Sequence, residues 1–589
     1  GMLRKMNVQC KPVFKNVIKL IKCRYSVSDS SSRSIRCLFN EYFIKHGHVH
    51  IPSSPVIPYQ DPSLAFVNAG MNQFKQVFLG NEVAPCASAV NSQKCIRVGG
   101  KHNDLKDVGL DGYHHTFFEM LGNWSFGQYF KLEACEFALK LLTEVFSLPM
   151  DRLYFTYFNG DDELGIPPDV ESRDVWRSIG IPDCQILPFG SCDNFWEMGP
   201  TGPCGPSSEI HYAKPGVSNP QLLVNQGTED VLELWNLVFI EFNRDSCGSL
   251  VKLPLKHVDT GMGLERLVAI LQRCQNNYET DLFQPLFNRI YSLTGAEKYK
   301  GKFSVEDKSG IDTAYRRLAD HARMITVALS DGMFPDEKHG KLRYVLRKAI
   351  HITQQEFGCY ENILPSMSEV VADSLGCAYP EIPRGLIRTK AILTHEYRLF
   401  NKLSEVGSHY LNTMNGQERQ HLLHYPLYEI PGLIVRYRDC ITNLVALSKT
   451  DCSNFEYGLK ELYLKFKLPV NIFEDLVRDV FDRYTFKLKI GEKESKFDSH
   501  IGINDDMIQV ANYLSFKHFS HTVDDLKYEV CIDGESWTIP EVKGTVLAIF
   551  LDNKYVSQLK LGEKGYIVTN KTNFYGQAGG QVGDTGDRK

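Results

Sequence analysis

Three separated segments of this chain combine charged side chains with glycine and aromatic residues, and the first of them spans residues 95–127. It consists of a short strand-like run that carries Arg97, a long polar loop, and a second strand-like run rich in aromatic residues. A guanidinium beside such a loop suits a phosphate group, because it offers paired donors and keeps its charge. A solvated charged face is the alternative, and the pattern alone leaves it open.

The second segment begins with residues 193–206, which are dense in glycine and proline and predict a rigid, shaped loop. Residues 234–239 then predict a buried strand that carries Asn236 among apolar neighbours. A buried amide needs hydrogen-bonding partners, and a ligand is one way to supply them. An ordinary structural role for Asn236 remains open at this point.

The third segment, residues 257–266, predicts a strand, a glycine turn and a helix that begins near Arg266. Gly261 and Gly263 permit close approach of the backbone to a ligand. A guanidinium in the first turn of the helix can lie flat against an adenine ring. By itself, the same pattern also fits a glycine hinge before an amphipathic helix.

The remaining chain supplies the elements that must position these segments. Apolar spacing predicts a helix that starts near Ile35 and ends at Gly47, followed by a proline-rich edge segment. Residues 131–181 read as mixed helices and strands. From residue 276 to about 516 the pattern is largely helical, with clear helices over 314–329 and 343–352, and short strands follow residue 528.

Composition limits the class of protein. A chain of 589 residues is too long for one core and predicts three or four domains. A net charge of −5 excludes a uniformly basic nucleic-acid coat, and no apolar run approaches the length of a membrane span. The sixteen cysteines include no C-x-x-C pair, so we expect neither a disulfide framework nor protein-bound zinc. We name no metal-ligating residues from the sequence.

The first 28 residues form a separate segment, basic and without an acidic side chain. Apolar residues recur between the basic ones at helical spacing, as in a mitochondrial transit peptide, with a processing region near Arg24. We therefore expect the mitochondrial matrix as the location. A frayed basic N-terminus is the alternative.

The words GGKHNDL (99–105) and HHTFFEMLG (114–122) resemble alanyl-tRNA synthetases, and Arg97 with its strand–loop–strand resembles motif 2 of class II aminoacyl-tRNA synthetases. The helix and proline-rich segment resemble motif 1, and residues 257–266 resemble motif 3. The resemblance implies an α+β fold: an antiparallel-sheet catalytic domain over 29–275, a mainly helical tRNA-recognition domain over 276–524, and a small β-barrel-like domain over 525–589.

The resemblance also implies an ATP-dependent alanine–tRNA ligase that uses Mg²⁺ and binds L-alanine and the acceptor stem of tRNA(Ala). The short apolar runs predict no membrane partner, and without the family's C-terminal oligomerisation domain we expect a monomer. The implied roles are catalytic for Arg97, Lys101 and Asp259; ATP-binding for Arg97, His115, Trp196, Leu234, Trp235, Asn236 and Arg266; alanine-binding for Trp196, Asn236, Val238, Asp259 and Gly261; and tRNA-binding for Arg343, Arg347 and Lys348. A non-catalytic RNA-binding paralogue is the main alternative, and an amino-acid activator without tRNA is a third.

Several features depart from this family. The sequence stops at Lys589, so we expect no editing domain and therefore measurable formation of seryl- and glycyl-tRNA. His421 and His424 have the wrong spacing for the editing zinc site and are interpreted as helix surface. Residues 336–348 lack the expected Asn, and Leu464 replaces a base-reading Asp, so we expect relaxed dependence on the G3·U70 pair of the tRNA.

Overall fold

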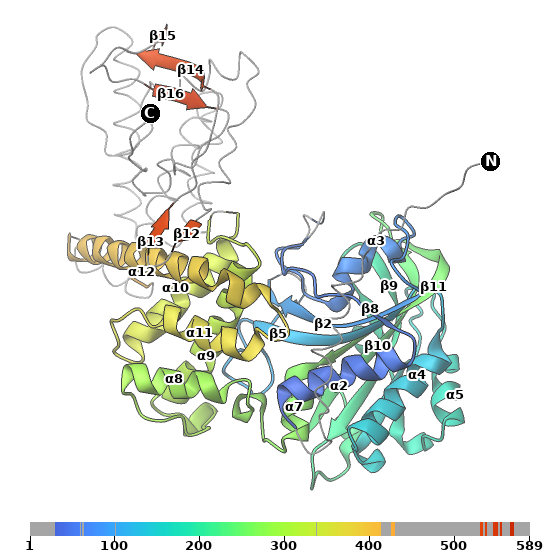
Figure 1. Cartoon of the computed structure of the whole chain (residues 1–589). Coiled ribbons are helices and arrows are strands. Elements are labelled where there is room, and N and C mark those ends of the chain that lie inside the picture. The colour runs from blue at the N-terminus through green and yellow to red at the C-terminus, as the bar shows by residue number, and fades with distance from the viewer. Residues whose placement is uncertain are drawn as a thin grey trace, which may run out of the picture. The chain divides into compact units, whose positions relative to one another are not determined.

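The computed structural model describes residues 30–58, 61, 64–99, 102–336, 338–413 and 426–429, and five short strands between 531 and 569. The chain divides into two compact units, residues 1–402 and 403–589 (Figure 1). The domain limits expected from the sequence remain predictions. The expected transit peptide, Lys101, the 421–424 histidine pair and Leu464 lie outside the described residues.

A nine-stranded sheet dominates the described part of the first unit, in the order β1-β2-β5-β11-β10-β9-β6-β7, with β8 paired to β9. Pairing is antiparallel from β2 to β6 and parallel at the two edges, where β1 joins β2 and β7 joins β6. The strands are β1 (Val49–His50), β2 (Ser88–Ile96), β5 (Phe117–Ser125), β6 (Leu153–Phe158), β7 (Ile186–Phe189), β8 (Phe195–Glu197), β9 (Gly202–Ala213), β10 (Val231–Arg244) and β11 (Leu250–Gly263). Together with the helices, this sheet confirms the expected α+β class.

Helices cover one face of the sheet, and Figure 1 shows α2 (Ser32–Lys45), α4 (Lys131–Lys140) and α7 (Leu264–Leu271) there. The predicted first helix is therefore confirmed. Along β5 the burial alternates, since Phe117 and Glu119 are buried while Phe118 and Met120 are half-buried. Successive side chains of a strand point to opposite faces, so Phe118 and Met120 face away from the covering helices.

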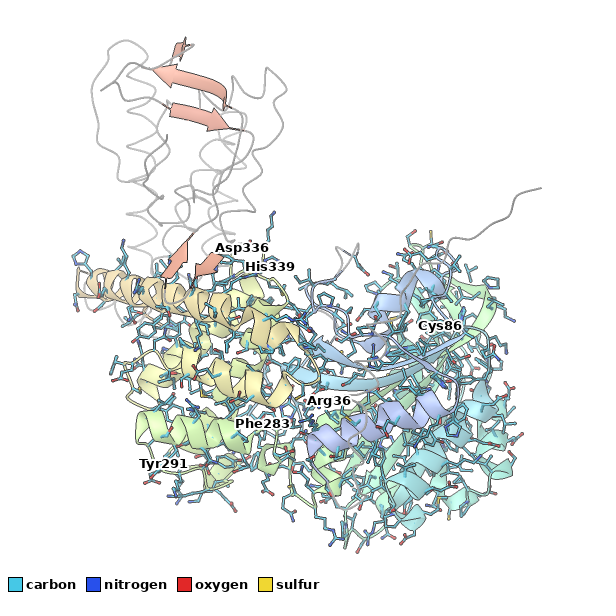
Figure 2. The ribbon with its side chains drawn as sticks, in the orientation of Figure 1. Arg36, Cys86, Phe283, Tyr291, Asp336 and His339 are labelled. Carbon is cyan, nitrogen blue, oxygen red and sulfur yellow. The ribbon has the colours of Figure 1, made fainter. Side chains whose placement is uncertain are left out.

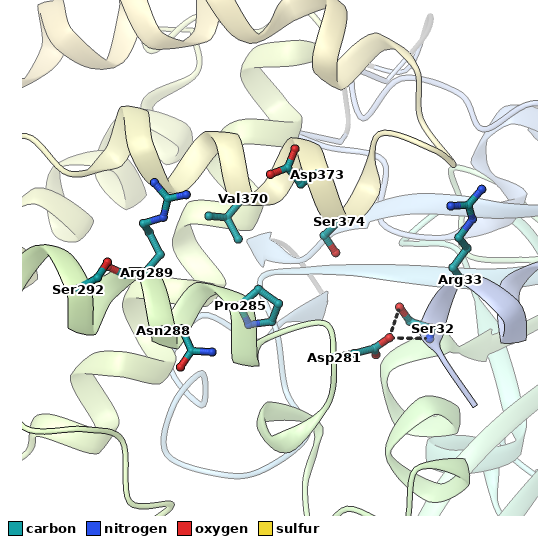
Figure 3. A pocket seen from close by; sticks show the side chains of 10 residues that line it. All are labelled: Ser32, Arg33, Asp281, Pro285, Asn288, Arg289, Ser292, Val370, Asp373 and Ser374. Atoms are coloured by element: carbon teal, nitrogen blue, oxygen red, sulfur yellow. Dashed lines mark hydrogen bonds between the residues drawn. The ribbon is translucent and has the colours of Figure 1, made fainter. Parts of the chain in front are cut away.

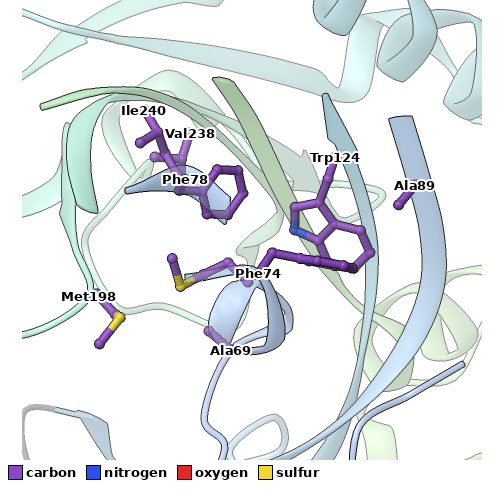
Figure 4. Packing of buried hydrophobic residues seen from close by; sticks show 9 residues of the cluster. Ala69, Phe74, Phe78, Ala89, Trp124, Met198, Val238 and Ile240 are labelled. Atoms are coloured by element: carbon purple, nitrogen blue, oxygen red, sulfur yellow. The ribbon is translucent and has the colours of Figure 1, made fainter. Parts of the chain in front are cut away.

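The opposite face carries the short helices η1 (Gly70–Phe74) and α3 (Lys75–Phe78) and a buried apolar cluster. Figure 4 shows this cluster, in which the Phe74 ring packs against Trp124 with centroids 4.9 Å apart. Val238 of β10 belongs to the same cluster. This packing places Trp124 and Val238 on the same face of the sheet as Phe118 and Met120.

Residues 193–206 are largely strand rather than the shaped loop that their composition predicts, because β8 and β9 run through them. Pro203 fits because the pairing of β9 with β10 shifts register near it, and such irregularities tolerate proline. A Cβ on Gly205 would lie 2.0 Å from the carbonyl oxygen of Phe239, so the close approach of β10 requires glycine. Gly261 and Gly263 likewise lie within β11 and not in a turn.

The helical region beyond residue 276 includes the two predicted helices, α9 (Ile311–Ser330) and α10 (Gly340–Gln355), which are confirmed. It also contains α8 (Gln284–Thr294), α11 (Leu364–Leu375) and α12 (Glu381–Thr413). α9 is buried along almost its whole length. None of the described helices is both long and apolar enough to span a membrane.

The remaining described elements are short. α5 (Val170–Ser178) and α6 (Ser191–Asn194) belong to the first unit, as do β3 (Val98–Gly99) and β4 (His102–Asn103), which pair within the loop after Arg97. In the second unit, β12 (Cys531–Asp533) pairs with β13 (Ser536–Thr538), and β14 (Val546–Leu551) pairs with β15 (Lys554–Val556) and β16 (Tyr566–Thr569). The expected barrel remains a prediction.

Candidate active site

A cavity of about 360 Å³ opens on the face of the sheet that α2 and α7 leave uncovered. All three sequence segments reach it, although they lie far apart in the chain. The predicted site residues that line it are Arg97, His115, Trp196, Leu234, Asn236, Val238, Asp259, Gly261 and Arg266. The cavity therefore brings the two guanidiniums and the carboxylate of Asp259 into one site.

Asp259 lies on β11 in one part of this cavity, and only 7% of the residue is exposed. The indole N–H of Trp124 donates a 2.6 Å hydrogen bond to its carboxylate. Burial raises the pKa of Asp259 to about 7, although the bond from Trp124 lowers it. A carboxylate with a single described donor in a dry site gains most from a bound cation.

The space beside Asp259 is small. Val238, which pairs with Asp259 across the sheet, is almost fully buried in the apolar cluster of Figure 4. A Cβ at Gly261 would lie 2.7 Å from the sulfur of Met120, so any larger residue here would displace Met120 into the cavity. We call this part of the cavity, lined by Asp259, Val238 and Gly261, the carboxylate pocket.

Arg97 and Arg266 define the other part, which we call the guanidinium pocket. The Nε of Arg97 donates to the carbonyl oxygen of Asn68 at 3.3 Å, and its guanidinium lies 4.9 Å from the centre of the Phe118 ring. The Nη1 of Arg266 donates to the carbonyl oxygen of Glu233 at 2.6 Å. Both guanidiniums are thus held in place and retain donors for an anionic ligand.

Two residues predicted to bind ATP are placed less directly. His115 is 3% exposed, stacks on Phe283 at 4.9 Å, and has Nε2 2.9 Å from the amide of Asn277. It touches the cavity but is largely held by protein partners. The side chain of Trp235 points to the opposite face and packs against Phe39 and Phe43, because it alternates with the cavity-facing neighbours on β10.

Several carboxylates that the sequence reading missed also line the cavity, among them Glu209 and Glu233. Burial and the nearby charge of Glu233 raise the pKa of Glu209, although its hydrogen bond with His211 opposes them. Asn236 donates to Glu209 at 3.3 Å, which gives that buried amide a protein partner. Within the described residues, no group of three or more His, Cys, Asp or Glu side chains is arranged to hold a metal ion.

Trp124 is the other important residue that sequence reasoning missed. It follows Phe118, Met120 and Gly122 at two-residue spacing along β5. That alternation would have placed it on the cavity face, but the sequence gives no sign that its indole reaches a residue 135 positions away. Arg343, Arg347 and Lys348 lie half-buried on α10 and do not line this cavity.

A second cavity, of about 650 Å³, lies between the start of α2 and helices α8 and α11 (Figure 3). Asp281 accepts hydrogen bonds there from the backbone N–H and hydroxyl of Ser32 at 2.9 and 3.0 Å. It is an open groove with side chains of both charges, including Arg33 and Asp373. None of the residues predicted to bind ATP or alanine lines it.

One cavity on an antiparallel sheet thus combines two guanidiniums with a buried carboxylate, a set of groups that suits a ligand with both anionic and cationic parts. The family model for class II (A) tRNA synthetases matches residues 34–427 and 458–588. This chain therefore belongs to the class II (A) family of tRNA synthetases.

Similar proteins include the mitochondrial alanine–tRNA ligase of Drosophila melanogaster, 44% identical over 94% of this chain and 57% of that protein. The mitochondrial alanine–tRNA ligase of Saccharomyces cerevisiae is 42% identical over 94% of this chain and 54% of that protein. The chain spans a little over half the length of these relatives. Apo histidyl-tRNA synthetase of S. aureus aligns with a TM-score of 0.27 and 10% identity over 46% of this chain and 72% of that one, too distant a likeness to guide interpretation.

Proposed function

We propose that this chain is an alanine–tRNA ligase, which activates L-alanine with ATP and transfers it to the 3′ end of mitochondrial tRNA(Ala). The observation that carries the proposal is Asp259, a buried carboxylate with one indole donor in a small apolar pocket beside two fixed guanidiniums. An α-ammonium group would supply the missing positive charge. The relatives are named as alanine–tRNA ligases, which supports alanine as the amino acid. Their mitochondrial names and the basic segment at 1–28 of this chain support a mitochondrial tRNA as the acceptor.

In the first step, a carboxylate oxygen of alanine attacks the α-phosphorus of ATP, and pyrophosphate leaves. Arg97 bridges the alanine carboxylate and the α-phosphate, Lys101 serves the phosphates, and Arg266 covers the base. In the second step, the terminal ribose hydroxyl of the tRNA attacks the acyl carbon, and AMP leaves. Neither step needs a protein nucleophile, so orientation and electrostatic stabilisation supply the catalysis.

Mg²⁺ accompanies the nucleotide in this proposal. The mutual repulsion of Glu209 and Glu233 in one cavity fits a divalent cation near them. Two carboxylates are enough when phosphate oxygens and water complete the coordination shell, which is how Mg²⁺ usually binds. When bound, the ion neutralises developing charge on the phosphates.

For the tRNA, we propose that Arg343, Arg347 and Lys348 of α10 contact the acceptor-stem backbone, with the protein acting as a monomer. Three basic residues on one helix fit such an electrostatic contact. Because residues 336–348 lack the expected Asn, we propose relaxed dependence on G3·U70. Charging of tRNA variants with G3·U70 and G3·C70 tests this, and strict loss of charging with G3·C70 would contradict it.

Alanine-dependent ATP–pyrophosphate exchange by the full chain tests the central proposal. We expect exchange with L-alanine and none with larger amino acids such as leucine, because Val238, Gly261 and Met120 restrict the pocket. Absence of alanine-dependent exchange by a folded chain that still binds tRNA(Ala) would favour the non-catalytic alternative.

A further inference from the structure

Behind the guanidinium pocket, a buried polar group joins the sheet to the helical region. Its centre is Glu119 of β5, which is 0% exposed. The carboxylate accepts two hydrogen bonds of 2.6 Å from Nε and Nη2 of Arg36, one of 2.7 Å from the hydroxyl of Tyr379, and one of 3.1 Å from the hydroxyl of Ser92. We call these four residues the Glu119 cluster; Figure 2 shows Arg36 on α2.

Glu119 is ionised and strongly hydrogen-bonded within this cluster. Burial by itself would raise the pKa of Glu119. The charge and hydrogen bonds of Arg36 and the hydrogen bond from Tyr379 instead hold this pKa below its usual value. Three of the four donors to Glu119 bind Oε2 and the fourth binds Oε1, so the carboxylate is hydrogen-bonded at both oxygens. Charge-assisted bonds in a dry environment are short and directional, so Glu119 has little freedom to move.

Tyr379 ties the helical region to this carboxylate, since it lies just before α12. A second link lies beside it, because Lys94 of β2 pairs with Glu119 across the sheet. The ammonium of Lys94 contacts Asp331 at 2.5 Å and also Glu381, and lies 5.3 Å from the centre of the Tyr379 ring. The helical region therefore holds adjacent positions on β2 and β5.

The cluster also connects to both guanidiniums of the cavity. Phe118, which supports Arg97, directly precedes Glu119 and points to the cavity. The backbone N–H of Glu119 donates to the carboxylate of Glu265 at 3.1 Å, and Glu265 directly precedes Arg266. A displacement of Glu119 would therefore move the supports of the guanidinium pocket. The charge of the carboxylate pocket has a separate anchor, because Asp259 is held by Trp124, and Glu119 reaches this pocket through its neighbour Met120.

We propose that Tyr379 and Glu119 are positioning residues for the nucleotide: the Tyr379 hydroxyl fixes Glu119, and Glu119 fixes Phe118 and the start of α7, so that this contact sets the affinity for ATP more strongly than the affinity for alanine. The proposal deepens the proposed function and rests on its assignment of ATP to the guanidinium pocket. It makes the packing of the helical region against the sheet a determinant of nucleotide binding.

The test compares Tyr379→Phe with Tyr315→Phe in the full 589-residue chain. Tyr315 is a matched control, because it is 0% exposed on α9 and its hydroxyl has no hydrogen-bond partner among the described residues. We measure the dissociation constant of Mg·ATP by equilibrium dialysis and the KM for alanine in pyrophosphate exchange. Tyr379→Phe should weaken ATP binding about tenfold, as expected for one hydrogen bond to a charged group, while Tyr315→Phe stays within about twofold.

The KM for alanine should remain within about twofold in both variants, a separation that general loosening of the fold would not produce. Ser92→Ala removes another donor to the same carboxylate, so it should also weaken ATP binding. The double variant Ser92→Ala/Tyr379→Phe should raise the ATP dissociation constant by less than the product of the two single effects. Equal ATP affinities for Tyr379→Phe and Tyr315→Phe, or an equal rise in the KM for alanine, would overturn the inference.

Failure of the proposed function gives a different result. A wild-type chain that binds ATP without alanine-dependent exchange would overturn the proposed function, and the ATP dissociation constants of the two tyrosine variants would still decide this inference. A wild-type chain that does not bind ATP would overturn both.

Discussion

The carboxylate pocket and the Glu119 cluster place two buried carboxylates only one strand apart, with opposite surroundings. Asp259 receives one hydrogen bond, from Trp124, and burial raises its pKa to about 7. Glu119 receives four, including two from Arg36, and its pKa stays below its usual value despite complete burial. Burial is common to both, so the charge of Arg36 and the larger number of donors separate Glu119, which holds the fold, from Asp259, which has room for a ligand cation.

The two carboxylates should also affect the stability of the unliganded protein differently. An ionised buried carboxylate without a counter-charge lowers stability until a ligand arrives, whereas one paired with a guanidinium is destabilising only when that partner is lost. Replacement by the neutral amide should therefore raise the free energy of unfolding at Asp259 and lower it at Glu119. The following experiments test that difference, from the largest expected effect to the smallest.

Replacement of Asp259 by Asn should have the largest effect on activity. Loss of the ion pair with the alanine ammonium should lower kcat/KM for alanine about 10³-fold in pyrophosphate exchange, since truncating a buried charge pair costs about 4 kcal/mol. The dissociation constant of ATP should change little. Retention of wild-type exchange by Asp259→Asn would show that another group binds the ammonium.

The same substitution should stabilise the unliganded protein above pH 7. The pKa of Asp259 rises from 3.8 to about 7 on folding, so the penalty for ionising it is absent below pH 3.8, grows through this interval, and is complete above pH 7. A neutral Asn avoids a penalty of up to about 4 kcal/mol. Urea unfolding at pH 8 measures the gain, and a lower midpoint for Asp259→Asn would contradict it.

Glu119→Gln should have the opposite sign. It leaves the guanidinium of Arg36 buried without its counter-charge, which should reduce the free energy of unfolding by about 3–5 kcal/mol. Glu136→Gln is a suitable control, because Glu136 pairs with Lys140 on an exposed helix surface and should leave the urea midpoint nearly unchanged. Equal midpoints for the two variants would remove the distinction between the carboxylates.

The pH dependence of alanine binding sharpens the comparison. Below pH 7 a proton on Asp259 competes with the alanine ammonium, so kcat/KM for alanine should fall about tenfold for each pH unit and level off above pH 7. Pyrophosphate exchange at saturating ATP from pH 5.5 to 9 measures this profile. A flat profile between pH 6 and 8 would contradict the raised pKa.

Trp124→Phe should have the smallest effect. The variant loses the one described donor that lowers the pKa of Asp259, so the midpoint of the alanine profile should move upward by about one pH unit. The KM for alanine should then be several-fold higher at pH 7 and approach the wild-type value at pH 9. An unshifted midpoint with a uniformly higher KM would indicate that Trp124 only shapes the pocket.

Much of the fold was readable from residue patterns. Apolar spacing predicted α2, α9 and α10, and resemblance to the class II motifs predicted an antiparallel sheet that unites Arg97, Asp259 and Arg266. The predictions from residue patterns were wrong where tertiary packing overrode a local preference. The glycines and prolines of 193–206 read as a loop, but tight packing of β9 on β10 makes glycine necessary inside a strand.

The assignment of adjacent strand residues to the two faces of the sheet was also incomplete. Leu234, Trp235 and Asn236 were all expected at the ATP site, yet strand alternation turns Trp235 toward Phe39 and Phe43. Trp124 was overlooked, although the same alternation from Phe118 would place it on the cavity face. Applying the two-residue period within each expected strand would have corrected both positions.

The sequence by itself determined which chemical groups are available, their order along the chain, and the periods that assign them to helix faces and sheet faces. It could not determine that Glu119 would receive four hydrogen bonds and Asp259 only one from the described residues. The donors to Glu119 come from residues 27, 83 and 260 positions away, and the donor to Asp259 comes from a residue 135 positions away. The folded chain decides this, because pKa and ligand affinity depend on burial and on partners that only tertiary packing brings within hydrogen-bonding distance.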